Sequence, residues 1–213
     1  MGAFISERWA DIAFRSYQHA SLVAQSVLLA TVIAVALAVV VTTVPRLEPV
    51  ANAISTVGLT IPSFALLGLL IPLCGIGTVT SVAVVTFYAV LPILRNAVVG
   101  FSGVDRNTVE AARGQGMSKS ATFLKVELPL AWPVILAGMR ISAQMSMGIA
   151  AISAYVLGPG LGGYIFSGLS RLGGANSFES VLTGVVAIIL LAFILDGLLV
   201  LLGRLTISRG INV

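Results

Sequence analysis

The hydrophobic residues of this chain gather in five long runs that are separated by shorter polar stretches. A bilayer core about 30 Å thick is crossed by a helix of about 20 apolar residues, and five segments reach that length. They are residues 21–44, 50–73, 79–101, 131–157 and 179–203. The pattern predicts an all-α integral membrane protein with about five transmembrane helices, in one transmembrane domain over residues 1–213.

Pro62 lies inside the second of these segments and affects the count of spans. Proline removes a backbone donor and bends or breaks a helix, although membrane helices tolerate it where neighbouring groups satisfy the freed carbonyl. Pro92 and Pro133 lie inside the third and fourth segments in the same way. A total of six spans, with the second segment divided in two, is therefore left open beside five.

The amino-acid composition supports a membrane location and excludes several kinds of site. Hydrophobic residues make up 58% of the chain and charged residues 9%, with a mean hydropathy of +1.07. A soluble domain carries about 25% charged residues. The single cysteine, Cys74, and the single histidine, His19, offer neither an intrachain disulfide nor a set of metal ligands. With eight acidic residues besides, no convergent catalytic set is present, so we expect no catalytic residue and no metal site.

The basic residues are distributed unevenly between the two ends of the predicted spans. If the polar segment 102–130 is cytoplasmic, that side collects Arg46, Arg106, Arg113, Lys119, Lys125, Arg204 and Arg209. The other side keeps Arg8, Arg15 and Arg171. Cytoplasmic loops of membrane proteins carry the excess of Lys and Arg. The bias therefore predicts an N-terminus outside the cell membrane and a C-terminus in the cytoplasm.

The polar segment between the third and fourth spans is predicted to form two short helices joined by a hinge. Asn107 and Glu110 have the spacing of a capping box for the first helix. Gly116 suits a left-handed residue that terminates this helix. Ser118 suits the N-cap of a second helix, which Pro129 closes before the fourth span. A solvated loop without a binding role is the alternative that the composition leaves open.

The spacing within this segment resembles the cytoplasmic EAA signature of permease subunits of binding-protein-dependent ABC importers. That signature is E-A-A, three residues, G, nine residues, I, one residue, L-P, and the sequence departs from it only by Val126 in place of isoleucine. The matching residues are Glu110, Ala111, Ala112, Gly116, Leu128 and Pro129. The resemblance implies a type I importer permease fold, in which residues 102–130 form a coupling segment whose helix docks on an ATPase.

The same resemblance implies a role for each matching residue. The first four, from Glu110 to Gly116, would dock on the ATPase, and Leu128 and Pro129 would place the helix. The implied partners are cytoplasmic ATP-binding subunits, a second permease copy or paralogue, an extracytoplasmic solute-binding protein and membrane lipid. We expect no cofactor on this chain, with ATP bound by a partner subunit, and no nucleic-acid partner.

Two matches to nucleotide-binding motifs are rejected. Gly158, Gly160 and Gly163 fit G-x-G-x-x-G, but they follow a membrane helix and not the strand that a dinucleotide site requires. Lys119-Ser120 lacks the preceding glycines of a phosphate loop. A soluble helix-turn-helix module is also excluded, because both ends of the coupling segment run directly into membrane spans.

Further segments resemble the glycine betaine, carnitine and choline branch of the permease family. They are Thr60-Ile61-Pro62-Ser63, Leu66-Leu67 ahead of Gly75-Ile76-Gly77, Leu91-Pro92-Ile93-Leu94-Arg95-Asn96, Lys125-Val126-Glu127-Leu128-Pro129 and Gly158-Pro159-Gly160-Leu161-Gly162-Gly163. The resemblance implies import of an osmoprotectant, with proline as a further candidate solute. The same machinery importing an amino acid such as methionine is one alternative. An ATP-independent channel is another, and flux through it would not depend on Glu110 or Gly116.

Three charged residues lie inside the predicted spans: Arg95, Arg140 and Asp196. Each lies about six to nine residues from the predicted cytoplasmic end of its span, which places all three roughly 10 Å deep at 1.5 Å per residue. Ionisable residues at such depth are costly and suggest function. We expect that the three can meet in a charge cluster, which either serves transport or fixes helix packing. Snorkelling of the arginines to the interface is the remaining alternative.

Several aromatic residues could line a transport path. Phe64, Tyr88, Tyr155 and Trp132 lie in or near the predicted spans, and aromatic faces attract quaternary ammonium groups. Aromatic residues also anchor membrane proteins at the lipid–water interface. Both roles are compatible with the sequence.

Overall fold

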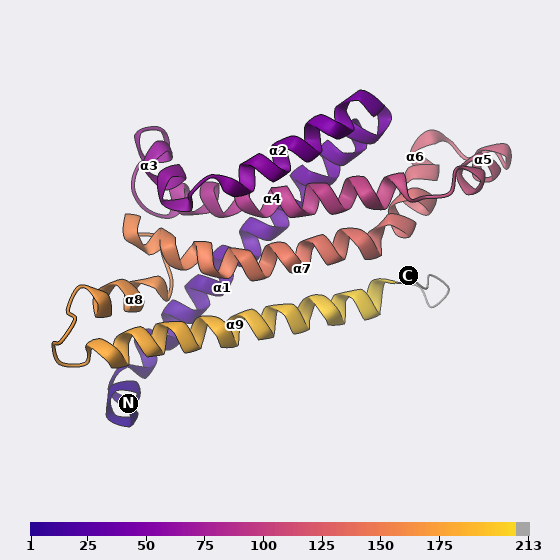
Figure 1. Cartoon of the computed structure of the whole chain (residues 1–213). Coiled ribbons are helices and arrows are strands. Elements are labelled where there is room, and N and C mark those ends of the chain that lie inside the picture. The colour runs from indigo at the N-terminus through magenta and orange to yellow at the C-terminus, as the bar shows by residue number, and fades with distance from the viewer. Residues whose placement is uncertain (208–213) are drawn as a thin grey trace.

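The fold is known from a computed structural model that describes residues 1–207, and these residues contain no β-strand (Figure 1). The α-helices are α1 (Gly2–Thr43), α2 (Glu48–Thr60), α3 (Ser63–Cys74), α4 (Thr78–Ser102), α5 (Arg106–Gly114), α6 (Lys119–Thr122), α7 (Leu128–Ser153), α8 (Gly162–Leu169) and α9 (Ser177–Thr206). Short 3₁₀ turns, η1 (Pro45–Leu47) and η3 (Ala154–Val156), and a π-helical turn, η2 (Phe123–Glu127), join them.

Four helical stretches of the described residues are long and apolar enough to cross a membrane. They are α1, α4, α9 and one continuous helix that runs through α7 from Lys119 to Val156. The bent pair of α2 and α3 makes a fifth if it counts as a single span. The prediction of an all-α membrane protein with about five spans is therefore confirmed.

The centre of the molecule is the pair α4 and α7, which lie side by side, while α1 crosses them diagonally (Figure 1). The face of α1 toward this pair is a stripe of alanines, Ala30, Ala34 and Ala38, each completely buried. Small residues at four-residue spacing let membrane helices approach closely. The core formed in this way holds the two helices that support the coupling segment.

Gly138 on α7 is required for the close contact with α4. A Cβ atom at Gly138 would lie 2.7 Å from the Cβ of Asn96. Gly138→Ala is therefore expected to lower the free energy of unfolding by about 1–3 kcal/mol, as overpacking does. Gly148→Ala is the matched control, since a Cβ there has nothing within 4 Å. Thermal unfolding of both purified variants in detergent measures the effect, and equal melting temperatures would contradict it.

The first span is longer than predicted. The expected segment began at residue 21, but α1 starts at Gly2 and has 42 residues, a length of about 63 Å. Two of the charges that lower the hydropathy of its first part are paired: Arg15 Nε donates to Asp11 Oδ2 at 2.9 Å, and the Tyr164 hydroxyl of α8 donates to the same oxygen at 2.6 Å. Burial and the hydrogen bond to Asp11 raise the pKa of Tyr164 to about 12.

The second segment is neither one straight span nor two spans. The axes of α2 and α3 differ by 97°, and both Ile61 and Pro62 between them are extended, as proline requires of the residue before it. The two helices have 13 and 12 residues, and each is too short to span a bilayer that needs about 20. The alternative of six spans is therefore wrong.

Tyr88 of α4 holds this bend. Its hydroxyl donates a hydrogen bond to the carbonyl of Ile61, and its side chain is only 4% exposed. A helix break leaves backbone carbonyls without intrahelical donors, so the phenol supplies a donor that the chain has lost. Tyr88 lies in the interior, and the expectation that it lines a path is corrected.

The two ends of the helical bundle differ in what they present (Figure 1). At one end lie α5, α6 and the end of α9, where Trp132 Nε1 donates to Thr206 Oγ1 at 2.7 Å. At the other end lie α3, α8 and the start of α1, and the hydrogen bond between Tyr164 and Asp11 joins α8 to α1. The start of α1 and the end of α9 are thus at opposite ends. Arg209, which entered the charge bias, lies outside the described residues.

Candidate coupling site

The coupling segment projects from the bundle beyond the ends of α4 and α7 (Figure 1). Its first helix, α5, is capped by Asp105, whose carboxylate accepts a hydrogen bond from the backbone N–H of Asn107 at 2.9 Å. The predicted capping box of Asn107 and Glu110 is therefore wrong. An aspartate two residues earlier satisfies the same free donors, and this leaves the carboxylate of Glu110 exposed.

The turn after α5 confirms the predicted role of Gly116. Gly116 has φ +89°, and its N–H donates to the carbonyl of Arg113 at 2.9 Å. The N–H of Met117 donates to the carbonyl of Ala112 at 3.2 Å. These two bonds form a Schellman motif, which satisfies the last carbonyls of the helix and reverses the chain. A left-handed residue at this position favours glycine strongly.

The second half of the coupling segment is continuous with the fourth span. Ser118 caps α6 as predicted, with its Oγ accepting from the N–H of Ala121 at 3.3 Å. Pro129, however, closes no separate helix, because the helix continues from Lys119 to Val156. Within it, Phe123–Glu127 form a π-helical turn, in which the N–H of Leu128 donates to the carbonyl of Phe123.

Pro129 explains the position of the π-helical turn. In a regular α-helix its ring would clash with the carbonyl four residues earlier, that of Lys125, and it has no N–H to offer. A wider turn immediately before Pro129 relieves that clash. The Leu-Pro pair of the signature thus determines how the helix of α6 is rotated relative to α7.

Replacing Pro129 is expected to change this rotation. Pro129→Ala restores a donor and removes the clash, so the wide turn should close to an α-turn and rotate the segment before it by about 100° relative to α7. Spin labels at Thr108→Cys and Leu201→Cys, both exposed positions, with Cys74→Ser, report this as a changed distance in pulsed EPR. Pro133→Ala is the control. An unchanged distance in Pro129→Ala would show that proline is not the cause.

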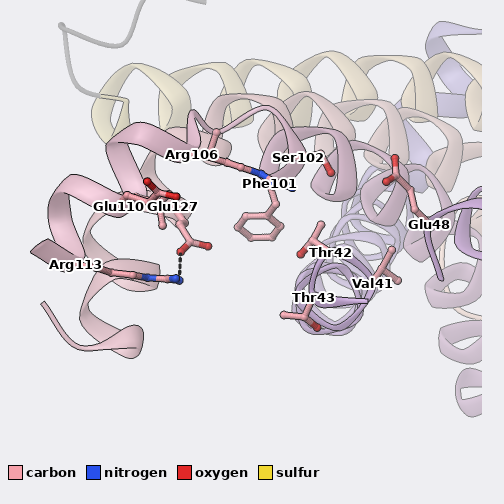
Figure 2. A pocket seen from close by; sticks show the side chains of 12 residues that line it. Val41, Thr42, Thr43, Glu48, Phe101, Ser102, Arg106, Glu110, Arg113 and Glu127 are labelled. Carbon is pink, nitrogen blue, oxygen red and sulfur yellow. Dashed lines mark ion pairs between the residues drawn. The ribbon is translucent and has the colours of Figure 1, made fainter. Parts of the chain in front are cut away.

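A cleft of about 600 Å³ lies between the coupling segment and the bundle (Figure 2). Its walls include Thr43 at the end of α1, Phe101 at the end of α4, Glu48 at the start of α2, and Arg106, Glu110, Arg113 and Glu127 of the coupling segment. Arg113 Nη2 lies 3.7 Å from Glu127 Oε1 and joins α5 to the π-helical turn. Both side chains are partly exposed, so this pair contributes about 1 kcal/mol at most.

The signature residues of α5 differ in their exposure. Ala112 is buried against the bundle, whereas Glu110 and Ala111 are exposed. Within residues 1–207 no ion pair involves Glu110. Leu128 packs against the core and Pro129 is exposed at the start of α7. α5 therefore offers an exposed carboxylate in the wall of the cleft, unpaired among the described residues and next to a small side chain, which permits close approach by a partner.

Two of the three intramembrane charges meet. Arg140 donates to both carboxylate oxygens of Asp196, from Nε at 2.8 Å and from Nη2 at 2.9 Å. These residues lie about 18 Å along α7 from Leu128 and about 15 Å along α9 from Thr206. Arg95 does not join them: it is exposed on α4 and makes no ion pair with any described residue.

Gln144 takes the third place in this cluster. Its Nε2 donates to Asp196 Oδ1 at 3.3 Å, so the carboxylate is held by two side chains of α7. Sequence reasoning missed Gln144 because it is uncharged. Its position one helical turn after Arg140 places it on the same face of α7, which is the signal that could have identified it.

Three aromatic rings pack together at the end of the bundle opposite the coupling segment. Phe64 of α3 and Tyr155 of η3 have ring centroids 5.4 Å apart. Phe166 of α8, which sequence reasoning missed, lies 6.4 Å from Phe64 and 5.8 Å from Tyr155. We call Phe64, Tyr155 and Phe166 the aromatic triad. Trp132 is not part of it, because it bonds to Thr206 at the other end.

Comparisons with known proteins agree with this architecture. The choline transport system permease protein OpuBB of Bacillus subtilis (strain 168) is 35% identical over 209 residues, covering 98% of this chain and 94% of that protein. The glycine betaine/carnitine/choline transport system permease protein OpuCB of the same organism is 33% identical, covering 100% and 96%. The osmoprotectant import permease protein OsmW of Salmonella typhimurium (strain LT2) is 37% identical, covering 94% of both chains.

The fold is also that of a solved transporter subunit. A chain of the inward-facing MetNI methionine ABC transporter superposes with a TM-score of 0.76 at 20% sequence identity, covering 93% of this chain and 96% of that one. At this identity the likeness concerns the fold alone. The family model described as "Binding-protein-dependent transport system inner membrane component" matches residues 30–208. This multi-pass membrane protein therefore belongs to the family of binding-protein-dependent transport system inner membrane components.

Proposed function

We propose that this chain forms half of the pathway of an ATP-driven importer for osmoprotectants such as choline, glycine betaine and carnitine. The solute class is supported by the relatives, which are named for these compounds and are 33–35% identical over nearly the whole chain. The ATP dependence is supported by the exposed face of α5, where Glu110 stands unpaired in the described chain beside Ala111. The proposal of ATP dependence rests on this face, because a passive channel does not need a surface that docks on an ATPase.

The other half of the pathway is a second copy of this chain or a paralogue. One face of α2 supports this: Val50, Ile54 and Val57 follow one another at helical spacing and are 50%, 58% and 63% exposed. Apolar residues exposed along one helix face mark a surface that contacts lipid or another protein. Covered by a partner subunit, this face and its counterpart enclose a path that a single chain does not.

The remaining partners follow from the two ends of the bundle. The end with α5 faces the cytoplasm, because the basic residues collect there, and α5 docks on a separate subunit that binds and hydrolyses ATP. The end with α3 and α8 faces outward, together with the start of α1, and receives solute from an extracytoplasmic binding protein. This chain itself holds no cofactor in the proposed cycle.

Uptake into proteoliposomes tests the function. The chain is reconstituted with its cognate ATPase and binding protein, and labelled choline, glycine betaine, carnitine and methionine are offered with and without ATP inside. ATP-dependent uptake of the first three is the expected result. Uptake of methionine alone would overturn the solute class, and choline flux that does not depend on ATP would overturn the importer in favour of a channel.

A further inference from the structure

The aromatic triad brings together three rings from parts of the chain that are far apart in sequence. Phe64 follows the bend at Pro62, Tyr155 follows the fourth span, and Phe166 lies on α8. The interplanar angles are 81° for Phe64 with Tyr155, 87° for Phe64 with Phe166, and 57° for Tyr155 with Phe166. The three rings therefore face different directions around a common corner and do not stack.

We propose that the aromatic triad is a binding site for the quaternary ammonium group of the solute, on the outward side of the pathway. The choice of solute rests on the function proposed above. The face of an aromatic ring attracts a cation within about 6 Å of its centroid. With centroids 5.4 to 6.4 Å apart, a trimethylammonium group resting on the open side of the corner reaches all three rings.

The rings are accessible, and no cation of the chain occupies them. Phe64 is 48% exposed and Tyr155 is 67% exposed. In the described part of the chain, the arginines that lie over rings are Arg8 over Phe4 and Arg15 over Tyr164. Among the described residues, no arginine therefore covers a ring of the aromatic triad, and the exposed sides of Phe64 and Tyr155 are open to a cation from outside the chain.

Phe166 lies on the face of α8 that is turned away from α1 and α9. The opposite face, formed by Tyr164 and Gly168 with Leu161 just before the helix, is buried against α1 and α9. Phe166 is two residues from Tyr164, which is about 200° around a helix, so it projects toward Phe64 and Tyr155. A ring that served only the core of α8 would lie on the buried face.

The backbone near the three rings is also held in place by a hydrogen bond and by close packing. Tyr88 holds the carbonyl of Ile61 just before Phe64. Between Tyr155 and Phe166, a Cβ at Gly160 would lie 2.8 Å from His19 Nδ1, and one at Gly162 would overlap the carbonyl of Ala151. This close packing positions the rings before any ligand arrives, which lowers the entropy that binding costs.

Leucine substitutions remove the aromatic ring but keep an apolar side chain, so they distinguish a contribution of the ring face from one of hydrophobic volume. Phe64→Leu, Tyr155→Leu and Phe166→Leu are each expected to reduce ATP-dependent choline uptake, measured well below saturation, by about 2- to 30-fold. Phe178→Leu is the matched control, because Phe178 is 72% exposed at the start of α9, at the same end of the bundle. Its uptake is expected to equal that of the wild type.

Fluorinated phenylalanines at positions 64 and 166 test the cation–π contact itself. Each added fluorine weakens the negative potential of the ring face while changing its size little. Uptake that declines step by step with the number of fluorines, in complexes of normal assembly, is the expected result. A flat series, or equal losses in Phe178→Leu and the triad variants, would overturn the site and assign the rings to packing or lipid anchoring.

Direct binding distinguishes a failure of this site from a failure of the proposed function. The chain with its ATPase, without binding protein, is placed in nanodiscs of phosphatidylethanolamine and phosphatidylglycerol, and tetramethylammonium is observed by saturation-transfer NMR. Binding that is lost in Tyr155→Leu supports the site even if the imported solute proves different. Wild-type choline import with no such binding would overturn the site and leave the importer intact.

Discussion

Glu110→Lys is expected to abolish ATP-driven uptake while leaving the amount of the inserted protein unchanged. The carboxylate of Glu110 is exposed in the wall of the cleft and makes no ion pair within residues 1–207, so its loss removes no ion pair from the fold. In the proposed complex it pairs with a basic residue of the ATPase. Losing one partner of such an interfacial pair costs about 2–5 kcal/mol, and reversal adds repulsion, so uptake should fall below about a tenth of the wild-type rate.

The control for this variant is Glu48→Lys. Glu48 lies at the same end of the molecule, in the wall of the cleft, and undergoes the same change of charge outside the signature. Because Glu48 is in the first turn of α2, the change costs about 1 kcal/mol or less through the helix dipole. Co-purification of the ATPase and uptake of labelled choline are measured for both. If Glu110→Lys retained both, or both variants lost uptake equally, α5 would not be the docking helix.

Asp196→Asn is expected to destabilise the protein more than removal of both charges of the pair. The single variant leaves Arg140 without its carboxylate inside the bilayer, where an uncompensated charge costs about 2.5–3.5 kcal/mol. Arg140→Gln combined with Asp196→Asn removes both charges, and hydrogen bonds between uncharged side chains replace the ion pair. The double variant should therefore recover most of the melting temperature and membrane yield that the single variant loses.

Arg95→Gln serves as the control for this pair, because Arg95 lies in a span but is exposed and makes no ion pair with a described residue. It is expected to be at least as stable as the wild type, because its removal leaves no carboxylate without a partner. Melting in detergent and the amount of inserted protein are compared for the wild type and the three variants. A double variant no more stable than Asp196→Asn would show that Arg140 and Asp196 do not act as a pair.

The predicted spans that the structure reproduces best are those whose boundaries depend on hydropathy alone. The segment expected at 79–101 is α4, Thr78–Ser102, and the one expected at 179–203 is α9, Ser177–Thr206. A long apolar run must form a helix in the bilayer because its backbone polar groups have no water to bond to. Gly116 was predictable for a similar local reason, since a left-handed turn favours glycine at its own position.

The structure departs from the prediction where a residue far away in sequence supplies a hydrogen bond that the local segment lacks. The first twenty residues contain charges that argue against a continuous helix, yet Tyr164 of α8 bonds to Asp11 and α1 begins at Gly2. The bend at Pro62 was visible in the sequence as a break, but its geometry depends on the hydroxyl of Tyr88. Local hydropathy contains no information about either partner.

By itself, the sequence determined that this protein is a helical membrane protein with an exposed coupling signature, because hydropathy, proline, glycine and fixed spacing act within one helix or turn. The tertiary structure alone decided which charged and aromatic residues meet. Asp196 pairs with Arg140 and Gln144 and not with Arg95, and Phe166 joins Phe64 and Tyr155. The physical reason is that such contacts depend on how each helix is rotated and packed against the others, and that rotation is set by the whole bundle.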